Sequence, residues 1–214
     1  MGQALKLYWR FLAQVCGGRG SVGVAGTGLL ILVLACLWDQ IREKEIALII
    51  GEPWEDMRQR SSARISPAIP NEIWHGIPEP DARLRFADSQ YGFLTPPARF
   101  FTIGYVRDVV TTVRMSPQVE PLLLEDTLKV VLDLQEQWRS SGWQSILTQT
   151  GPPFADTSQS RSRLRNARNG SVTYWQAGEK YQVMLVVRHF VDDKRPTDER
   201  YLITLALSKP WIKY

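Results

Sequence analysis

The chain has 214 residues, 44% of them hydrophobic and 22% charged, and its formal net charge is +4. The positive excess lies in the first 38 residues, which hold Lys6, Arg10 and Arg19 and no acid, so the remainder carries 23 basic and 22 acidic residues. A near-neutral remainder of this size is enough for one domain with a proper core, and it gives no general reason to expect nucleic acid as a partner. Both cysteines, Cys16 and Cys36, precede residue 39, so the remainder can form no disulfide.

Residues 20–38 contain no charged side chain and end in an aliphatic run closed by Trp38. A helix of this length spans about 30 Å, the thickness of the hydrocarbon core of a bilayer. We therefore predict a transmembrane anchor over residues 20–38, in contact with membrane lipid. The alternative for this stretch is a buried core helix of a soluble protein.

The same region contains residues 18–23, Gly-Arg-Gly-Ser-Val-Gly, which match the G-x-G-x-x-G pattern of dinucleotide-binding proteins. That pattern needs a buried strand before it. Here the preceding residues Leu5, Tyr8, Leu12 and Val15 follow helical spacing instead. We expect no nucleotide and no other cofactor.

The charges around the anchor set its orientation. The positive-inside rule leaves residues 1–19 in the cytoplasm, where they can form an amphipathic helix on the inner leaflet, and sends the rest of the chain outward. In a bacterium this gives a single-pass inner-membrane protein with a periplasmic C-terminal domain. Residues 33–36, Val-Leu-Ala-Cys, leave open cleavage or lipidation at Cys36, but we favour an uncleaved anchor.

Residues 39–84 are interpreted as a juxtamembrane segment followed by a proline-rich linker, because prolines interrupt the chain from residue 67 onward. Residues 85–214 are predicted to form the periplasmic domain. It begins with a short strand near residues 91–94. A hairpin follows, in which the runs at residues 100–106 and 109–115 meet at Arg107-Asp108 without the usual turn glycine.

The clearest predicted helix lies within residues 122–143. Its apolar side chains recur at helical spacing and Gly142 is a plausible C-cap; the stripe consists of Leu124, Leu128, Val131, Leu134 and Trp138. A strand near residues 143–149, a polar segment with one helical turn at 151–170, and three strands forming an antiparallel meander complete the chain. The prediction is an α+β fold, with an antiparallel sheet of four to six strands and one amphipathic helix packed on a face.

No catalytic or metal-binding constellation stands out. His75 and His189 are far apart in the sequence, and no G-x-S-x-G marks a serine nucleophile. The acid pairs Glu125-Asp126 and Asp192-Asp193 are explained by a helix first turn and a charged turn. We predict that the protein is not an enzyme, with an unrecognised envelope hydrolase as the weakest alternative.

A basic cluster is the candidate partner-binding surface. Arginines gather between residues 161 and 168, and exposed Trp and Arg are enriched at protein interfaces. The competing interpretation is a solvated segment without a partner. The candidate residues are Arg161, Arg163, Arg165, Arg168 and Trp175.

Three stretches, "YGFLTPPARFF", "VRMSPQVEPL" and "VVLDLQEQWRSSGW", resemble the membrane-anchored periplasmic immunity proteins that accompany type VI secretion effectors. The resemblance covers residues 85–143, rests on no functional motif and carries over no binding residue. It implies a stoichiometric inhibitor that binds a secreted toxin in the periplasm. The alternative is a structural or accessory subunit of an envelope secretion or pilus machine.

Overall fold

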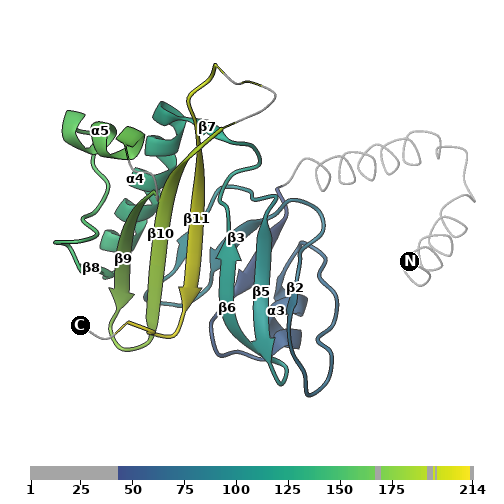
Figure 1. Cartoon of the computed structure of the whole chain (residues 1–214). Helices are drawn as coiled ribbons and strands as arrows, with labels where there is room; N and C mark the ends of the chain where they lie inside the picture. The colour runs from purple at the N-terminus through teal and green to yellow at the C-terminus, as the bar shows by residue number, and fades with distance from the viewer. Residues whose placement is uncertain (1–42, 167–169, 192–194, 196, 213–214) are drawn as a thin grey trace, which may run out of the picture. The chain divides into compact units, whose positions relative to one another are not determined.

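The computed structural model describes residues 43–166, 170–191, 195 and 197–212, and Lys44–Tyr214 form one compact unit (Figure 1). The predicted N-terminus (1–19) and the predicted anchor (20–38) lie outside the described residues. Within the described part, no helix is both long and apolar enough to cross a membrane.

The compact unit is α+β, as the sequence predicts. Its elements in chain order are β1 (Glu45–Leu48), α3 (Trp54–Arg60), β2 (Ile73–Gly76), β3 (Arg83–Phe86), β4 (Phe93–Leu94), β5 (Phe101–Val106), β6 (Val109–Met115), β7 (Leu122–Leu123), α4 (Leu124–Ser140), β8 (Gln144–Ile146), α5 (Ser158–Asn166), β9 (Ser171–Ala177), β10 (Tyr181–Phe190) and β11 (Arg200–Ser208).

The main sheet has eight strands, so the predicted four to six were too few. Seven follow the order β2-β5-β6-β11-β10-β9-β8, and β7 pairs with β11. Every pairing in this sheet is antiparallel, and β9, β10 and β11 form the predicted meander. The prediction missed β2 and β7, which are four and two residues long and too short to show a periodic pattern.

A second sheet of three strands has the order β1-β3-β4, with β1 and β3 parallel. Residues 45–84, expected to be juxtamembrane and linker, are therefore part of the folded unit. The apolar side chains of β1 are buried in the core, and Glu45 at its start forms ion pairs with Arg83 (3.5 Å) and Arg85 (3.0 Å) of β3. Together these contacts bind the supposed linker to the rest of the domain.

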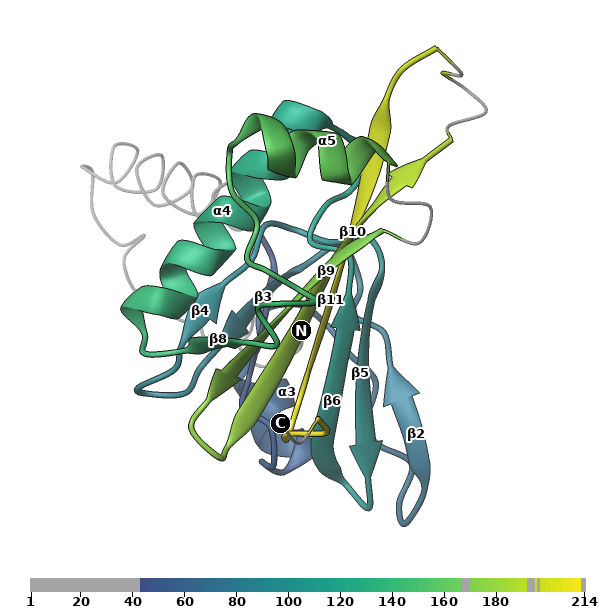
Figure 2. The ribbon, with the colours of Figure 1, turned by 60° about the vertical axis from the view of Figure 1, so that its left-hand side comes forward.

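Helix α4 matches the prediction closely. The five residues of its predicted stripe are all buried, and Gly142 follows the helix with a φ of +85°. A left-handed residue just after a helix is the usual position for glycine, which has no Cβ to clash. The helices and the three-stranded sheet lie on one face of the main sheet (Figure 2). Strands β9 and β11 accordingly alternate between buried and half-buried residues.

The β5–β6 hairpin also forms as predicted. Its turn residues Arg107 and Asp108 have φ angles of +48° and +63°. This left-handed pair is the backbone that a two-residue hairpin prefers, and it matches the twist of the strands. The segment expected to hold a single helical turn contains the nine-residue helix α5 instead.

Candidate protein-interaction site

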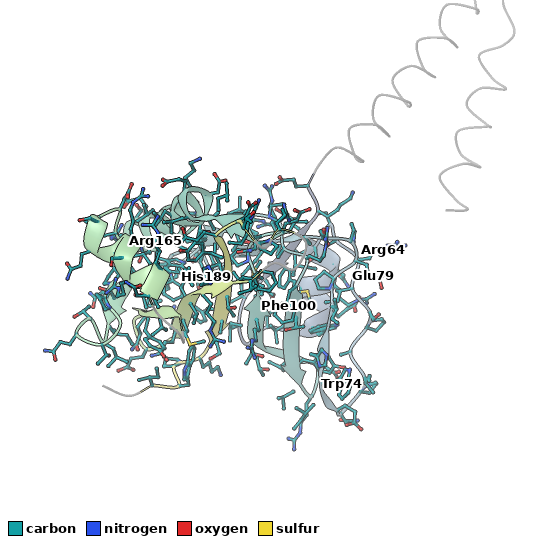
Figure 3. All side chains as sticks on the ribbon, turned by 45° about the horizontal axis from the view of Figure 1, so that its top comes forward. Arg64, Trp74, Glu79, Phe100, Arg165 and His189 are labelled. Atoms are coloured by element: carbon teal, nitrogen blue, oxygen red, sulfur yellow. The ribbon has the colours of Figure 1, made fainter. Side chains whose placement is uncertain are left out.

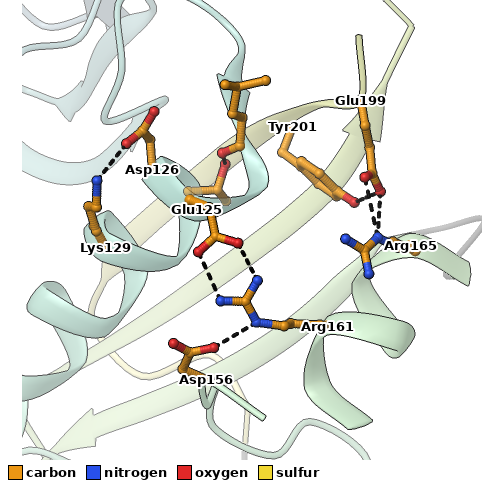
Figure 4. Close-up of polar contacts among 10 residues, drawn as sticks. Glu125, Asp126, Lys129, Asp156, Arg161, Arg165, Glu199 and Tyr201 are labelled. Atoms are coloured by element: carbon orange, nitrogen blue, oxygen red, sulfur yellow. Dashed lines mark hydrogen bonds and ion pairs between the residues drawn. The ribbon is translucent and has the colours of Figure 1, made fainter. Parts of the chain in front are cut away.

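Two of the predicted partner-binding arginines hold α5 in place (Figure 4). Both terminal nitrogens of Arg161 contact Glu125 of α4, and its Nε lies 2.7 Å from Asp156. The Arg165 Nε lies 3.1 Å from Glu199, just before β11. These ion pairs link α5 to α4 and to Glu199 next to β11, so part of the charge of the predicted cluster is paired within the chain.

The Glu199 carboxylate is a junction of two contacts. It also accepts a hydrogen bond from the hydroxyl of Tyr201. Burial raises the pKa of Glu199, but the bonds from Tyr201 and Arg165 outweigh it and leave that pKa below its ordinary value. Burial and the neighbouring carboxylate raise the pKa of Tyr201. The Glu199 carboxylate therefore stays charged near neutral pH and keeps its ion pair with Arg165 of α5.

The other predicted surface residues do not form a common patch. Trp175 is only 2% exposed, packs against Trp138 with ring centroids 5.7 Å apart and lies 5.4 Å from the Arg139 guanidinium. The alternation of β9 turns Trp175 toward the core, so it is not one of the exposed tryptophans. Arg163 is half-buried, and its Nε has no hydrogen-bond partner in the described part of the chain. Arg168 lies outside the described residues.

The titratable pairs singled out in the sequence do not converge on a site. Glu125 contacts Arg161, and Asp126 forms an ion pair of 2.9 Å with Lys129 on the same helix. His189 is exposed on β10, with its ring edge-on to Tyr201. Asp192 and Asp193 lie outside the described residues. In the described ranges, no three His, Cys, Asp or Glu side chains gather as metal ligands.

The structure instead shows an apolar surface at the edge strand β2. Of the eleven large hydrophobic residues exposed in the described chain, six lie on this strand, next to it or at the turn of the adjoining β5–β6 hairpin, including Ile73 (72% exposed) and Trp74 (57%). Ile73 faces Val106 of β5, which in turn faces Val109 of β6. Alternation along β2 puts Ile73 on one face of the sheet with Val106 and Val109, and puts Trp74 on the other face, opposite Tyr105, so the exposed apolar residues line both sides of this sheet edge. We call this sheet edge the edge patch; it consists of Ile69, Ile73, Trp74, His75, Ile77, Val106 and Val109. Figure 3 shows Trp74 projecting at the margin of the molecule, far from Arg165.

A pocket of about 320 Å³ opens within the edge patch. Its floor is aromatic, because the rings of Trp54 and Tyr105 lie 4.7 Å apart there. The segment from Ser66 to Ile69 forms one wall. The Ser66 carbonyl accepts from the Trp54 indole (3.0 Å), and the Ile69 amide donates to the Tyr105 hydroxyl (2.8 Å). The wall is thus fixed to the floor by hydrogen bonds.

Charged side chains of both signs surround the patch. Glu72 and Glu79 flank β2. The main chain of Glu79 is hydrogen-bonded to that of Arg64, and the main chain of Glu72 to that of Arg107. All four side chains are exposed, and none forms an ion pair with another described residue. An apolar centre with a polar rim is the usual anatomy of a protein interface.

Sequence reasoning missed the edge patch because it treated "IPNEIWHGIPEP" as linker. The available signal was a tryptophan and isoleucines within a stretch divided by prolines at residues 70 and 78. A group of large apolar residues in a stretch of this kind indicates either core or an interaction surface.

Comparison of the chain with known protein families, with curated proteins and with solved structures gives no match.

Proposed function

We propose that this protein is a single-pass inner-membrane protein whose periplasmic domain binds and neutralises a secreted toxin, and that the toxin docks on the edge patch. The observation that carries the proposal is the concentration of exposed apolar side chains at one edge strand. Isolated exposed apolar residues are ordinary on a protein surface, whereas a concentration of them beside polar groups is typical of an interaction site. The resemblance of residues 85–143 to immunity proteins supports the toxin as the partner.

Trp74 is the expected centre of the interface. It is the most exposed tryptophan of the described chain, and it stacks on His75 with ring centroids 5.1 Å apart. Tryptophan dominates interfacial binding energy because one rigid ring buries a large apolar area. Truncation of such an anchor typically costs about 2 kcal/mol of binding, or about thirtyfold in affinity.

The test is competition between sibling cells. Deletion of the gene should make cells sensitive to toxin-delivering siblings, and the wild-type gene should restore protection. Trp74→Ala should fail to restore it, although the variant keeps its stability within about 0.5 kcal/mol, as surface substitutions do. The matched control is Trp211→Ala, which removes another exposed tryptophan (45%) outside the edge patch. Equal protection by the two variants would remove the edge patch from the proposal.

Topology is tested separately, with a reporter fused after Tyr214. The proposal expects activity of a periplasmic reporter. A reporter active only in the cytosol would contradict both the orientation and toxin neutralisation outside the cytoplasm.

A structural subunit of an envelope machine is the second candidate, favoured by the two open ends of the main sheet at β2 and β8. Open edges permit lateral assembly. Deletion separates the two functions, because loss of a machine subunit abolishes secretion, whereas loss of an immunity protein leaves secretion intact and the cell unprotected.

A further inference from the structure

The main-chain groups on the outer edge of β2 follow from its register with β5. The Arg107 amide donates to the Glu72 carbonyl (3.0 Å), one step before Ile73 pairs with Val106. Opposed residues of antiparallel strands alternate between bonded and non-bonded pairs. Trp74 and Gly76 are therefore bonded to β5, while the N–H and C=O groups of Ile73 and His75 point away from the sheet.

In the described part of the chain, no segment bonds to these outward groups. Strand β2 ends the sheet, and the bridge between Arg64 and Glu79 lies beyond the strand. The neighbouring segment that contains Ser66 and Ile69 uses its polar groups on Trp54 and Tyr105 instead. The edge also carries no lysine, arginine or proline within residues 73–76, the usual guards of an exposed strand.

The pocket lies where an added strand would place a side chain. Gly76 faces the floor, because a Cβ on it would lie 2.7 Å from the Trp54 ring. Gly76 has no side chain of its own, and the pocket that it lines lies at the lower end of the range for ligand sites, about 300 to 1,000 Å³. A residue opposite Gly76 on a neighbouring strand would point to the same face, where a large apolar side chain enters the pocket.

We propose that the partner supplies an extended segment that adds to the outer edge of β2 as a strand, with a large apolar side chain seated in the pocket opposite Gly76. This inference rests on the proposed function and specifies how the toxin is held. Main-chain bonds to Ile73 and His75 give affinity, and the pocket gives specificity. The occupant is a non-proline segment of the partner, since proline lacks the N–H that the ladder needs.

A second copy of this chain fits the edge less well. The antiparallel register that places Trp74 of one copy opposite Gly76 of the other also sets the two His75 side chains face to face. It brings Glu72 of each copy opposite Pro78 of the other, next to Glu79. Glu72 of one copy and Glu79 of the other then lie one position apart across the pair, and nearby like charges repel each other.

The experiment replaces an outward N–H without disturbing the sheet. His75→Pro removes that donor, and proline is tolerated on an edge strand when its nitrogen faces away from the neighbouring strand. The matched control His75→Val removes the same imidazole but keeps the N–H. In sibling competition with the full chain, His75→Pro should protect less well than His75→Val, because one lost main-chain hydrogen bond weakens binding by about tenfold. Ile73→Pro against Ile73→Val provides a second pair at the first residue of the strand, should His75→Pro unfold.

The outcomes separate the two proposals. Protection by valine variants and its loss in folded proline variants support strand addition. Protection by both variants of each pair overturns strand addition and leaves toxin neutralisation standing. A deletion strain that is not sensitive overturns the proposed function and, with it, this inference. If the purified full chain sediments as a dimer in detergent and His75→Pro makes it a monomer, the occupant is a second copy and strand addition by the partner is overturned.

Discussion

Three tryptophans show how little residue type alone decides. Trp138 is fully buried and Trp175 nearly so, whereas more than half of Trp74 is exposed. Composition predicts that some tryptophans are core and some are anchors, and it does not say which. Which face of β9 meets the core and where β2 lies in the sheet decide the matter, and both depend on contacts between segments far apart in the sequence, such as Trp175 with Trp138 and Trp74 with Tyr105.

Asp88 offers a residue-scale prediction about pH. Its carboxylate accepts hydrogen bonds from the amides of Gln90 and Tyr91 (both 2.9 Å) and from the hydroxyl of Tyr181 (3.0 Å). Burial alone raises the pKa of Asp88, but these bonds and the nearby Lys180 charge together lower it. Burial and the hydrogen bond to Asp88 raise the pKa of Tyr181 to about 12.

Because the pKa of Asp88 is lower in the folded state, its contribution to stability is full above the unfolded pKa of about 4 and is lost as the pH falls through the folded value. The Asp88→Asn variant has no carboxylate to protonate. Urea unfolding of the full chain should therefore give a free energy that declines less steeply below about pH 5 in the variant. Parallel curves for the two proteins would contradict a depressed pKa at Asp88.

At the scale of elements, the sequence predicted the helices and strands that are long enough to show a periodic pattern of apolar residues. Helix α4, the β5–β6 hairpin and the β9–β11 meander all carry clear patterns of apolar residues, and all are present. The missed elements β1, β2 and β3 are four residues each. β1 also pairs in parallel with β3, a partner that follows it only after a helix and another strand. A short apolar run cannot reveal such a partner.

The hairpin turn provides an element-scale prediction. Asp108 holds a left-handed φ of +63°, which costs a non-glycine residue about 1 kcal/mol. Asp108→Gly should raise the free energy of unfolding by up to about 1 kcal/mol, reduced by the greater freedom of glycine in the unfolded chain. The backbone bond from the Trp54 amide to the Asp108 carbonyl (2.7 Å) is retained.

Chemical denaturation of the full chain measures this change. Asp108→Val is the opposing control, because a β-branched side chain is least tolerated at positive φ, and it should lower stability. If the glycine variant is less stable than the parent, the turn is not strained.

At the scale of the whole molecule, the domain begins earlier than composition suggests. The compact unit starts at Lys44, and β1, α3, β2 and β3 all precede residue 85. They provide core residues such as Leu48, Trp54 and Leu84. The candidate site also includes residues on both sides of residue 85, since the edge patch combines β2 with Val106 and Val109 of the predicted domain. Assigning residues 39–84 to a linker therefore misses both the N-terminal part of the core and the candidate site.

Truncation tests this boundary. A chain of residues 44–214 should unfold in one cooperative thermal transition, because it retains the complete core. A chain of residues 85–214 should show no such transition by circular dichroism, since it loses core residues such as Leu48, Trp54 and Leu84. Cooperative unfolding of the shorter chain would restore the boundary at residue 85.

The shortness of β2 has a consequence for the life of the protein before it meets a partner. An exposed apolar edge strand is a template on which further chains can stack into fibrils. Here the strand is four residues long, and Pro70 and Pro78 stand on either side of it. Fibril spines need longer uninterrupted segments, commonly six or seven residues. The protein thus keeps the exposed strand β2 available to a partner without forming fibrils of its own.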